Sequence, residues 1–191
     1  MDIDRFVSSC VDAAKEDDVQ AAVKEVLTEA VSDHASVRTA LGEPAKAGVE
    51  ILHRSESLTI LNALWTPRMN LMPHDHLMWS LIGIYSGRED NILWRRTEDS
   101  IKSAGAKALF EGDVVAFNDK TIHSVTNPLR KFTGGIHIYG GDFFDTKRSL
   151  WDPETLEEGP SDGDVIKEIF DRENEVYEMS VSGEKNEEKA V

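Results

Sequence analysis

The stretch MNLMPHDHLMWSLIGIYSG, residues 69–87, decides the fold that the sequence predicts. It holds an extended run with two histidines and then an apolar run at 79–85, and a Ser-Gly pair ends it with a turn signal. Side chains alternate between the two faces of a strand, so His74 and His76 point to the same side. A His-x-His pair occurs by chance in many strands, and its surroundings decide whether it binds a metal.

Short strand-like runs continue on both sides of this stretch. They are rich in apolar and β-branched residues and are separated by Gly, Pro, Asn and Asp. Many short strands at regular spacing, with no helices between them, predict a mainly β protein with an antiparallel sandwich or barrel. The further runs lie at residues 49–53, 58–65, 91–96, 114–117 and 135–139.

The two ends of the chain have other patterns. Residues 1–45 place apolar side chains at three- and four-residue intervals with a break at 16–18, which predicts helices packed on the barrel or on a second subunit. The barrel itself is expected at 46–150, and a C-terminal extension with one short helix follows at 151–179. Residues 180–191 are polar and charged, and we expect a disordered tail there.

Composition limits the partners and the compartment. The chain of 191 residues suits one domain, and its formal net charge of −15 argues against long-range attraction to nucleic acid or to anionic membrane surfaces. The single cysteine, Cys10, excludes an internal disulfide and fits a reducing compartment. No apolar run approaches the roughly 20 residues of a membrane span, and the acidic start is no signal peptide. We therefore expect a cytoplasmic protein, monomeric or homodimeric.

A third histidine, His123, follows in another strand-like segment. Three imidazoles would fill one face of an octahedron and leave about three coordination positions open. That open geometry suits non-haem iron chemistry with oxygen, although the usual version replaces one histidine with a carboxylate. The residues alone leave the choice of metal open among iron, nickel, zinc and manganese.

Residues 53–144, roughly half of the chain, resemble the cysteine dioxygenase family, which are iron-dependent thiol dioxygenases of the cupin superfamily. The similarity is greatest to the less characterised bacterial-type members. It implies a cupin double-stranded β-helix, a jelly-roll barrel with N-terminal helices and a short C-terminal helix. It also implies a metal-binding oxidoreductase that uses Fe(II) and O2 to oxidise a small thiol, cysteine-like or mercaptocarboxylate-like, to its sulfinate. The matching motifs are residues 69–87, GDVVAFNDKTIHSVTN at 112–127, and GIHIY at 135–139, where the family has Ser-x-His-x-Tyr.

One departure from ordinary cupins concerns the metal ligands. Those proteins supply a glutamate shortly after the second histidine, where this chain has Ser80 and Leu81. The next acids, Glu89 and Asp90, follow a glycine turn and are interpreted as solvated or salt-bridged. A ligand set of neutral imidazoles leaves the full charge of iron(II) available to an anionic arm of the substrate, such as a thiolate. The resemblance therefore implies three ligands without a carboxylate: His74, His76 and His123.

His137 and Tyr139 share one face of the strand expected at 135–139. The resemblance implies that the Tyr139 hydroxyl donates a hydrogen bond to bound oxygen or to the substrate, and that His137 orients this hydroxyl. Gly135 replaces the serine of the family, so the hydrogen-bond chain through the two side chains lacks its outermost member. Without the resemblance, the simpler interpretation is a buried tyrosine and histidine whose polar atoms are satisfied by the backbone.

A small thiol carboxylate would need an arginine fork to hold it. Arg54 lies roughly where the resemblance puts the carboxylate-binding arginine of cysteine dioxygenase. Arg68, just upstream of the histidine pair, is the second candidate for the substrate-binding arginine. A structural salt bridge or plain solvation explains any single arginine at least as simply.

Two other classes of function remain open at this stage. Other metal-dependent cupins cleave carbon–carbon bonds with oxygen, or act as lyases with a tyrosine or carboxylate base and no oxygen. A non-catalytic cupin that binds a small molecule or senses a metal would turn over no substrate. Oxygen uptake separates the dioxygenase from the lyase, and any turnover separates both from the binding protein.

Overall fold

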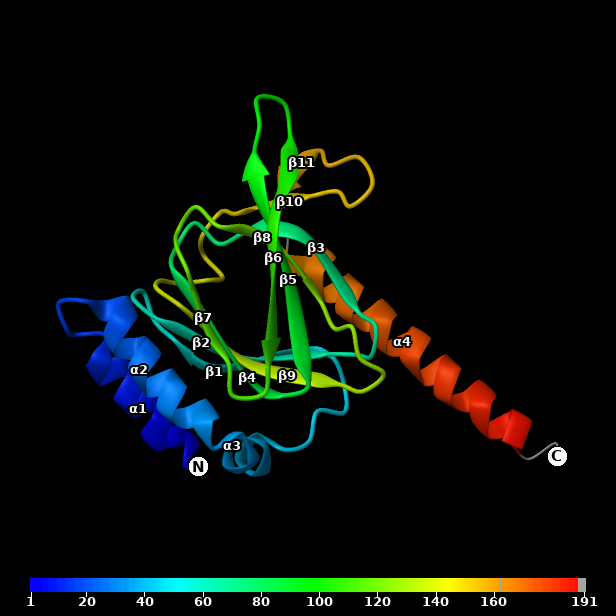
Figure 1. Cartoon of the computed structure of the whole chain (residues 1–191), viewed down its shortest axis with the longest axis horizontal. Coiled ribbons are helices and arrows are strands. Elements are labelled where there is room, and N and C mark those ends of the chain that lie inside the picture. Colours follow the sequence, from blue (N-terminus) through cyan, green and yellow to red (C-terminus); the bar gives the residue numbers. More distant parts are fainter. Residues whose placement is uncertain (162, 189–191) are drawn as a thin grey trace.

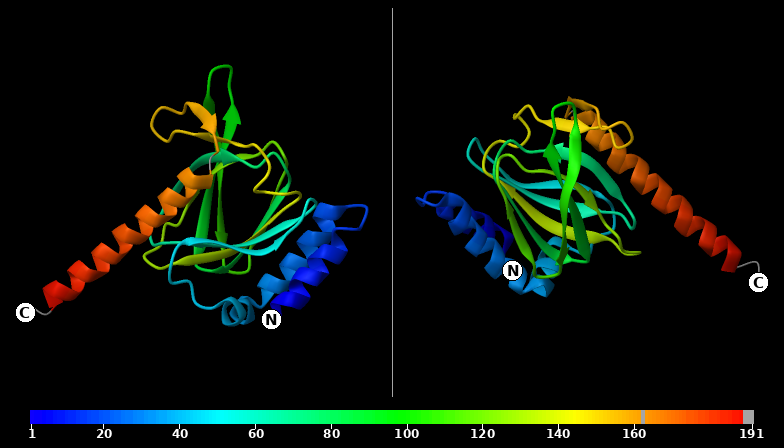
Figure 2. Two further views of the ribbon diagram at one scale, coloured as in Figure 1. Left: turned by 180° about the vertical axis from the view of Figure 1, so that it is seen from behind. Right: turned by 45° about the horizontal axis from the view of Figure 1, so that its top comes forward.

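The computed structural model describes residues 1–161 and 163–188, and two antiparallel β-sheets form its centre (Figure 1). Within these ranges, three helices lie on one side of the barrel and a long fourth helix leaves it on another (Figure 2). The helices are α1 (Ile3–Ala13), α2 (Val19–Ser32), α3 (His34–Leu41) and α4 (Gly163–Glu188). The strands are β1 (Gly48–Arg54), β2 (Thr59–Trp65), β3 (Asn70–Asp75), β4 (Ser80–Ser86), β5 (Arg88–Arg96), β6 (Ile101–Phe110), β7 (Val114–Phe117), β8 (Ile122–Thr126), β9 (Thr133–Tyr139), β10 (Ser149–Trp151) and β11 (Glu158–Pro160).

Strands that are distant in sequence pair with each other. One sheet has five strands in the order β1-β2-β9-β4-β7, and the other has six in the order β11-β10-β3-β8-β5-β6. β3 pairs with β8 while β4 pairs with β9, so the chain passes back and forth between the two sheets. This arrangement is a jelly-roll barrel, the double-stranded β-helix, and it confirms the fold class predicted from the sequence.

The central strands of the five-stranded sheet are buried on both faces. β4 and β9 are buried along their whole length. Their outward side chains, such as Leu81 and Ile138, pack against Leu27 of α2 and other apolar side chains of the N-terminal helices. Their inward side chains, such as Tyr139, lie inside the barrel. Because both faces need apolar side chains, residues 79–85 form an almost unbroken apolar run instead of alternating.

The helices expected at 1–45 pack on the barrel, and their ends follow from local hydrogen bonds. The carboxylates of Asp2, Asp18 and Asp33 each accept a hydrogen bond from a backbone N–H in the first turn of a helix. Cys10 is fully buried between the helices and the sheet, and burial raises the pKa of its thiol to about 12. The thiol therefore stays protonated at neutral pH, and its role is to fill the core.

The strand β6 was not expected from the sequence. Its residues include glycine, alanine and lysine, which are depleted in strands, and most of its side chains are exposed. β6 lies at the edge of the six-stranded sheet and pairs with β5 along nearly its whole length. The ladder to β5, rather than local propensity, therefore holds this segment extended.

The C-terminal helix is longer than expected. α4 has 26 residues and ends at Glu188, although we expected a disordered tail from residue 180. Near its start Phe170 is buried and stacks on Trp65, with ring centroids 5.5 Å apart. Its later residues include several glutamates, a methionine and a lysine, which are good helix formers, and the helix continues past the barrel (Figure 1). Residues 189–191 of the expected tail lie outside the described residues. No helix in the described part of the chain is long and apolar enough to cross a membrane.

The contact between α2 and the barrel gives a stability prediction. Leu27 has no exposed surface and lies in the core between α2 and β4. Leu27→Ala should lower the free energy of unfolding by about 2–5 kcal/mol, because it removes buried surface and leaves a cavity. Urea denaturation measures this loss. The neighbouring Thr28 is exposed, so Thr28→Ala should change stability far less, and equal losses in the two variants would contradict the packing described.

Candidate metal centre

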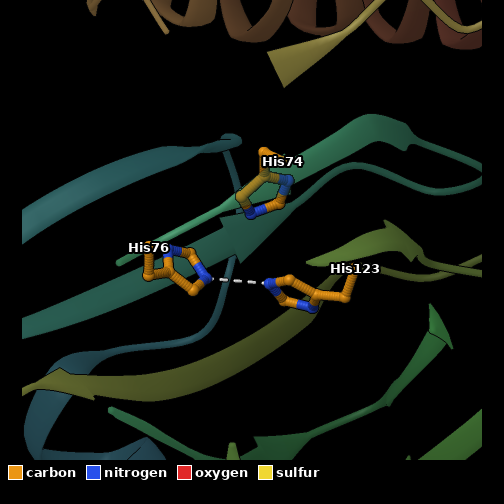
Figure 3. A group of neighbouring side chains, drawn as sticks. All are labelled: His74, His76 and His123. Atoms are coloured by element: carbon orange, nitrogen blue, oxygen red, sulfur yellow. Dashed lines mark hydrogen bonds between the residues drawn. The ribbon is translucent and has the colours of Figure 1, made fainter. Parts of the chain in front are cut away.

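Three histidine side chains meet inside the barrel (Figure 3). His74 of β3 and His123 of β8 are paired residues of the antiparallel ladder, and His76 follows just beyond the end of β3. Their candidate ligand atoms all lie within 4.8 Å of one another, and all three residues are buried. The structure therefore brings together the three residues that the sequence singled out.

Hydrogen bonds on the far side of two rings fix which nitrogen is free. His74 Nδ1 lies 2.9 Å from the carbonyl oxygen of Met72, which can only accept, so Nδ1 carries the hydrogen. His123 Nδ1 lies 2.6 Å from Oδ1 of Asn91 and donates to it in the same way. The Nε2 lone pairs of both rings then remain for a ligand in the space between them.

The third ring completes a donor set that suits a metal. His76 Nε2 lies 2.8 Å from His123 Nε2 (dashed line in Figure 3). Among the described residues, the buried Nδ1 of His76 has no hydrogen-bond partner. Three imidazole nitrogens that converge in a buried space fit a divalent first-row metal such as iron, nickel or zinc. Geometry and donor chemistry thus agree that this cluster could hold a metal.

Burial also sets the charge of the cluster. Desolvation lowers the pKa of His74 to about 4, and it holds the pKa values of His76 and His123 well below the usual value for histidine. Nearby positive groups, including Arg148, act in the same direction on His74 and His76. The three rings are therefore neutral at physiological pH, which is the form that binds a metal.

The sequence predicted that Glu89 and Asp90 are solvated or salt-bridged, and the structure separates the two residues. Asp90 forms an ion pair with Arg88 at 2.7 Å, as expected for a salt-bridged acid. Glu89 has no exposed surface, so the expectation that it is solvated was wrong. The reason is strand alternation, because Glu89 and Asn91 point into the barrel from β5 while Asp90 points out. The Glu89 carboxylate accepts hydrogen bonds from Asn91 Nδ2 and from Trp65 Nε1, both at 3.0 Å, and it lies behind the ligands rather than among them.

His137 and Tyr139 lie beside the three histidines. Their side chains point into the barrel from β9, and the Tyr139 ring centroid is 4.8 Å from that of His76. His137 Nδ1 is 3.3 Å from the Tyr139 hydroxyl, and His137 Nε2 is 3.2 Å from Oε2 of Glu89. The hydrogen-bond chain that seemed incomplete because of Gly135 therefore has an outer member after all. Glu89 supplies it from β5, a different strand.

A cavity of about 390 Å³ opens onto the cluster. The three histidines and Tyr139 line its inner end. Apolar side chains form most of the walls, and α4 contributes part of the outer wall through Ile166 and Phe170. The volume suits a small organic molecule rather than a macromolecule.

The structure does not bring the two expected arginines to this cavity. Arg54 is exposed and binds Asp142 through both carboxylate oxygens, at 2.9 Å from Nε to Oδ1 and 2.9 Å from an Nη to Oδ2. Arg68 is exposed in a turn with a φ of 68°, and neither residue lines the cavity. Arg54 thus has the structural salt bridge that was its simpler interpretation.

A third arginine, which the sequence analysis did not single out, lines the cavity. The guanidinium of Arg148 lies over the ring of Phe143 at 3.7 Å from its centroid. Its buried Nε has no hydrogen-bond partner among the described residues, and desolvation lowers the pKa of Arg148. Arg148 lies in the loop between β9 and β10, where no strand or helix pattern indicated a direction for its side chain.

The cluster gives a prediction about metal binding. His123→Ala should abolish stoichiometric binding of iron(II), because two imidazoles remain and no carboxylate replaces the third. Metal content after anaerobic loading and desalting measures this, and circular dichroism checks the fold. His53→Ala is the control, since His53 lies on β1 outside the cluster and should leave metal content unchanged. Full metal retention in His123→Ala would refute the ligand assignment.

Comparisons with known proteins show a similarity in fold and none in sequence family. No protein-family model matches the chain, and no curated protein matches it. Among solved structures, the DMSP lyase DddQ from Ruegeria pomeroyi is 15% identical, with 67% of this chain and 77% of that chain covered and a TM-score of 0.49. An uncharacterized protein with a double-stranded β-helix domain from Klebsiella pneumoniae is 10% identical, with 57% and 82% covered and a TM-score of 0.46. An RmlC-like cupin family protein from Methanocaldococcus jannaschii is 15% identical, with 52% and 85% covered and a TM-score of 0.44. The Klebsiella and Methanocaldococcus proteins are described as double-stranded β-helix proteins, and the strand order given above shows that architecture for this chain independently.

Proposed function

We propose that this protein is an iron(II)-dependent dioxygenase that oxidises a small thiol carboxylate to its sulfinate. One observation carries the proposal: three neutral imidazoles without a carboxylate ligand lie at the inner end of a cavity that also contains Arg148. The cluster offers a site for a redox metal and a thiolate, and the arginine offers a site for the other end of the substrate. In the proposed reaction the sulfur gains both oxygen atoms of O2 and supplies the electrons that O2 takes up, so no further reductant is needed.

His74, His76 and His123 would hold the iron. When bound, iron(II) would supply redox chemistry with O2 and a cation for the thiolate. The protein contributes neutral ligands, and Met72 and Asn91 hold the hydrogens of His74 and His123 on the far side of the rings. Because the ligands are neutral, they do not offset the positive charge of the metal, and this favours binding of an anionic group of the substrate.

Arg148 would bind the carboxylate of the substrate. The chain has a formal net charge of −15, so an anion needs a local cation to enter this cavity. The guanidinium lies against Phe143, and its buried Nε has no partner among the described residues, so a carboxylate would complete its hydrogen bonds. A bidentate fork also orients the substrate along the cavity, with its sulfur toward the histidines.

Tyr139 would contact the reacting end of the substrate. Its ring lies next to His76 at the inner end of the cavity, and burial raises the pKa of Tyr139, so it is a neutral phenol at physiological pH. A phenol at this place can hydrogen-bond the substrate where charge changes during the reaction. Leu61 and Phe143 pack around the ring and limit the access of water.

A second candidate function rests on the hydrogen-bond chain from Tyr139 to Glu89. This chain could take a proton from the phenol, which would let Tyr139 act as the base of a lyase. In such a reaction the tyrosine oxygen takes a carbon-bound proton, a new carbon–carbon π bond forms, and the leaving group departs with its electron pair. No oxygen is consumed.

An oxygen electrode distinguishes the two functions. The protein is loaded with iron(II) or with zinc(II), which has no redox chemistry, and is tested against small thiols with and without a carboxylate. Thiol dioxygenase activity predicts that the iron form consumes oxygen and forms sulfinate, and that the zinc form does neither. Substrate breakdown by both metal forms without oxygen uptake would instead establish the lyase. No turnover with either metal would contradict both.

The substrate-binding role of Arg148 can be tested by substitution. Arg148→Gln should raise KM for a thiol carboxylate roughly 10- to 100-fold, since a charge-assisted hydrogen bond contributes about 1.5–3 kcal/mol. KM for a thiol that lacks the carboxylate should change little. Arg54→Gln is the matched control, because Arg54 lies outside the cavity in its pair with Asp142. The assignment fails if both variants affect the two kinds of thiol alike.

Tyr139→Phe tests the role of the phenol. The variant should keep the iron content of the wild type, because Tyr139 is not one of the clustered ligands. It should lose roughly a hundredfold or more in kcat, the usual cost of removing one hydrogen-bonding group that acts in the transition state. Metal analysis and initial rates measure the two effects separately. Turnover at the wild-type rate would make Tyr139 a core residue only.

A further inference from the structure

The Glu89 carboxylate joins two chains of hydrogen bonds inside the barrel. The first runs through His137 to Tyr139, and the second runs through Asn91 to His123. Its Oε1 accepts from Asn91 Nδ2 at 3.0 Å, and its Oε2 accepts from Trp65 Nε1 at 3.0 Å. The ring of His137 reaches the same Oε2 with its Nε2 at 3.2 Å. Glu89 has no exposed surface, and no lysine or arginine of the described residues is paired with it. Three N–H groups therefore satisfy this carboxylate.

In the first chain, the chemistry of the side chains determines which group donates each hydrogen bond. An indole N–H can only donate, so Oε2 of Glu89 acts as an acceptor for Trp65. Because both oxygens of the carboxylate accept, His137 must carry its hydrogen on Nε2 and donate it to Glu89. In the form of the ring that carries this one hydrogen, Nδ1 is an acceptor. The Tyr139 hydroxyl, 3.3 Å from this Nδ1, is left to donate to it.

The second chain of hydrogen bonds leads to His123, a candidate metal ligand. Because the amide hydrogens of Asn91 point at Glu89, its Oδ1 faces His123 Nδ1 at 2.6 Å. The hydrogen of His123 is thereby kept on Nδ1, and the lone pair stays on Nε2, the atom that faces His76. One carboxylate thus determines the hydrogen-bond direction on both sides of the site.

We propose that Glu89 is a positioning residue that fixes the tautomers of His137 and His123, so that the Tyr139 hydroxyl donates to His137 and presents its oxygen lone pairs to the cavity. This polarity is the reverse of that expected from the sequence, in which Tyr139 donates to the substrate. The phenol oxygen can then accept a hydrogen bond from a molecule bound in the cavity. These hydrogen-bond directions are independent of whether the proposed oxidation occurs.

A carboxylate, and not merely a polar side chain of this size, is required at this position. A glutamine has one acceptor oxygen, whereas the N–H groups of Trp65, Asn91 and His137 occupy both oxygens of Glu89. In Glu89→Gln the amide hydrogens must face at least one of these donors. Trp65 cannot reverse its hydrogen bond, so the change is passed on to Asn91 or to His137.

The wild-type protein alone provides the first test. Two-bond ¹H–¹⁵N correlation spectra of the metal-free chain of 191 residues report which ring nitrogen of each histidine carries the hydrogen. We expect His137 with its hydrogen on Nε2 and an unprotonated Nδ1, and we expect His123 with its hydrogen on Nδ1. A hydrogen on Nδ1 of His137 would overturn the proposal, and this result needs no variant to fold.

The isosteric variant provides the second test, with Asp90→Asn as its control. In Glu89→Gln we expect the tautomer of His137 or of His123 to change, whereas Asp90→Asn should leave both unchanged because Asp90 faces outward beside Arg88. Zinc affinity, measured by competition with a chelator, should fall roughly 10- to 100-fold in Glu89→Gln and stay at the wild-type value in the control. Wild-type tautomers at both histidines and wild-type zinc affinity in Glu89→Gln would together refute a positioning role.

Discussion

A carboxylate buried inside a barrel without a cationic partner is costly unless hydrogen bonds saturate it, and the site is organised around this requirement. Glu89 meets it with N–H groups from Trp65, Asn91 and His137, which belong to three different strands. Each donor is held in one orientation, because any other would leave a buried polar atom unpaired. The candidate ligand His123 and the phenol of Tyr139 are one step further along these hydrogen bonds, so their orientation depends on the same carboxylate.

The barrel separates the groups that stabilise it from the groups that form the site. The outer face of the five-stranded sheet packs against α1, α2 and α3, which contribute the largest apolar cluster. The inner face of the same sheet carries His137 and Tyr139. Because β9 has its neighbours β2 and β4 on both sides, it is a rigid support for two side chains that must keep fixed distances. Helices α1, α2 and α3 thus support the site without lining its cavity.

Local charge in the cavity differs from the charge of the whole chain. The protein is strongly acidic, yet Arg148 lies at the cavity with its Nε unpartnered among the described residues, near a cluster that could hold a divalent cation. An anion is therefore repelled by the chain as a whole and would meet a positive side chain only inside the cavity. The apolar walls, with part of α4 outside them, exclude water and strengthen every electrostatic interaction within.

The sequence by itself determined the features that depend on the periodicity of single strands. The strand spacing predicted the mainly β barrel, and alternation placed His137 and Tyr139 on one inward face. Residue type and spacing made the histidine pair and His123 candidate metal ligands, the resemblance to cysteine dioxygenases implied the set of three, and the structure brings them together.

Only the tertiary structure decided which faces meet. Alternation could have separated Glu89 from Asp90, but only the pairing of β5 with β8 shows that Glu89 faces the interior, beside Asn91 and behind His123. Arg148 comes from a loop whose direction no local pattern encodes, whereas the expected Arg54 points outward to Asp142. The physical reason is that a side chain's neighbours across a barrel are set by long-range strand pairing, which local sequence patterns do not contain.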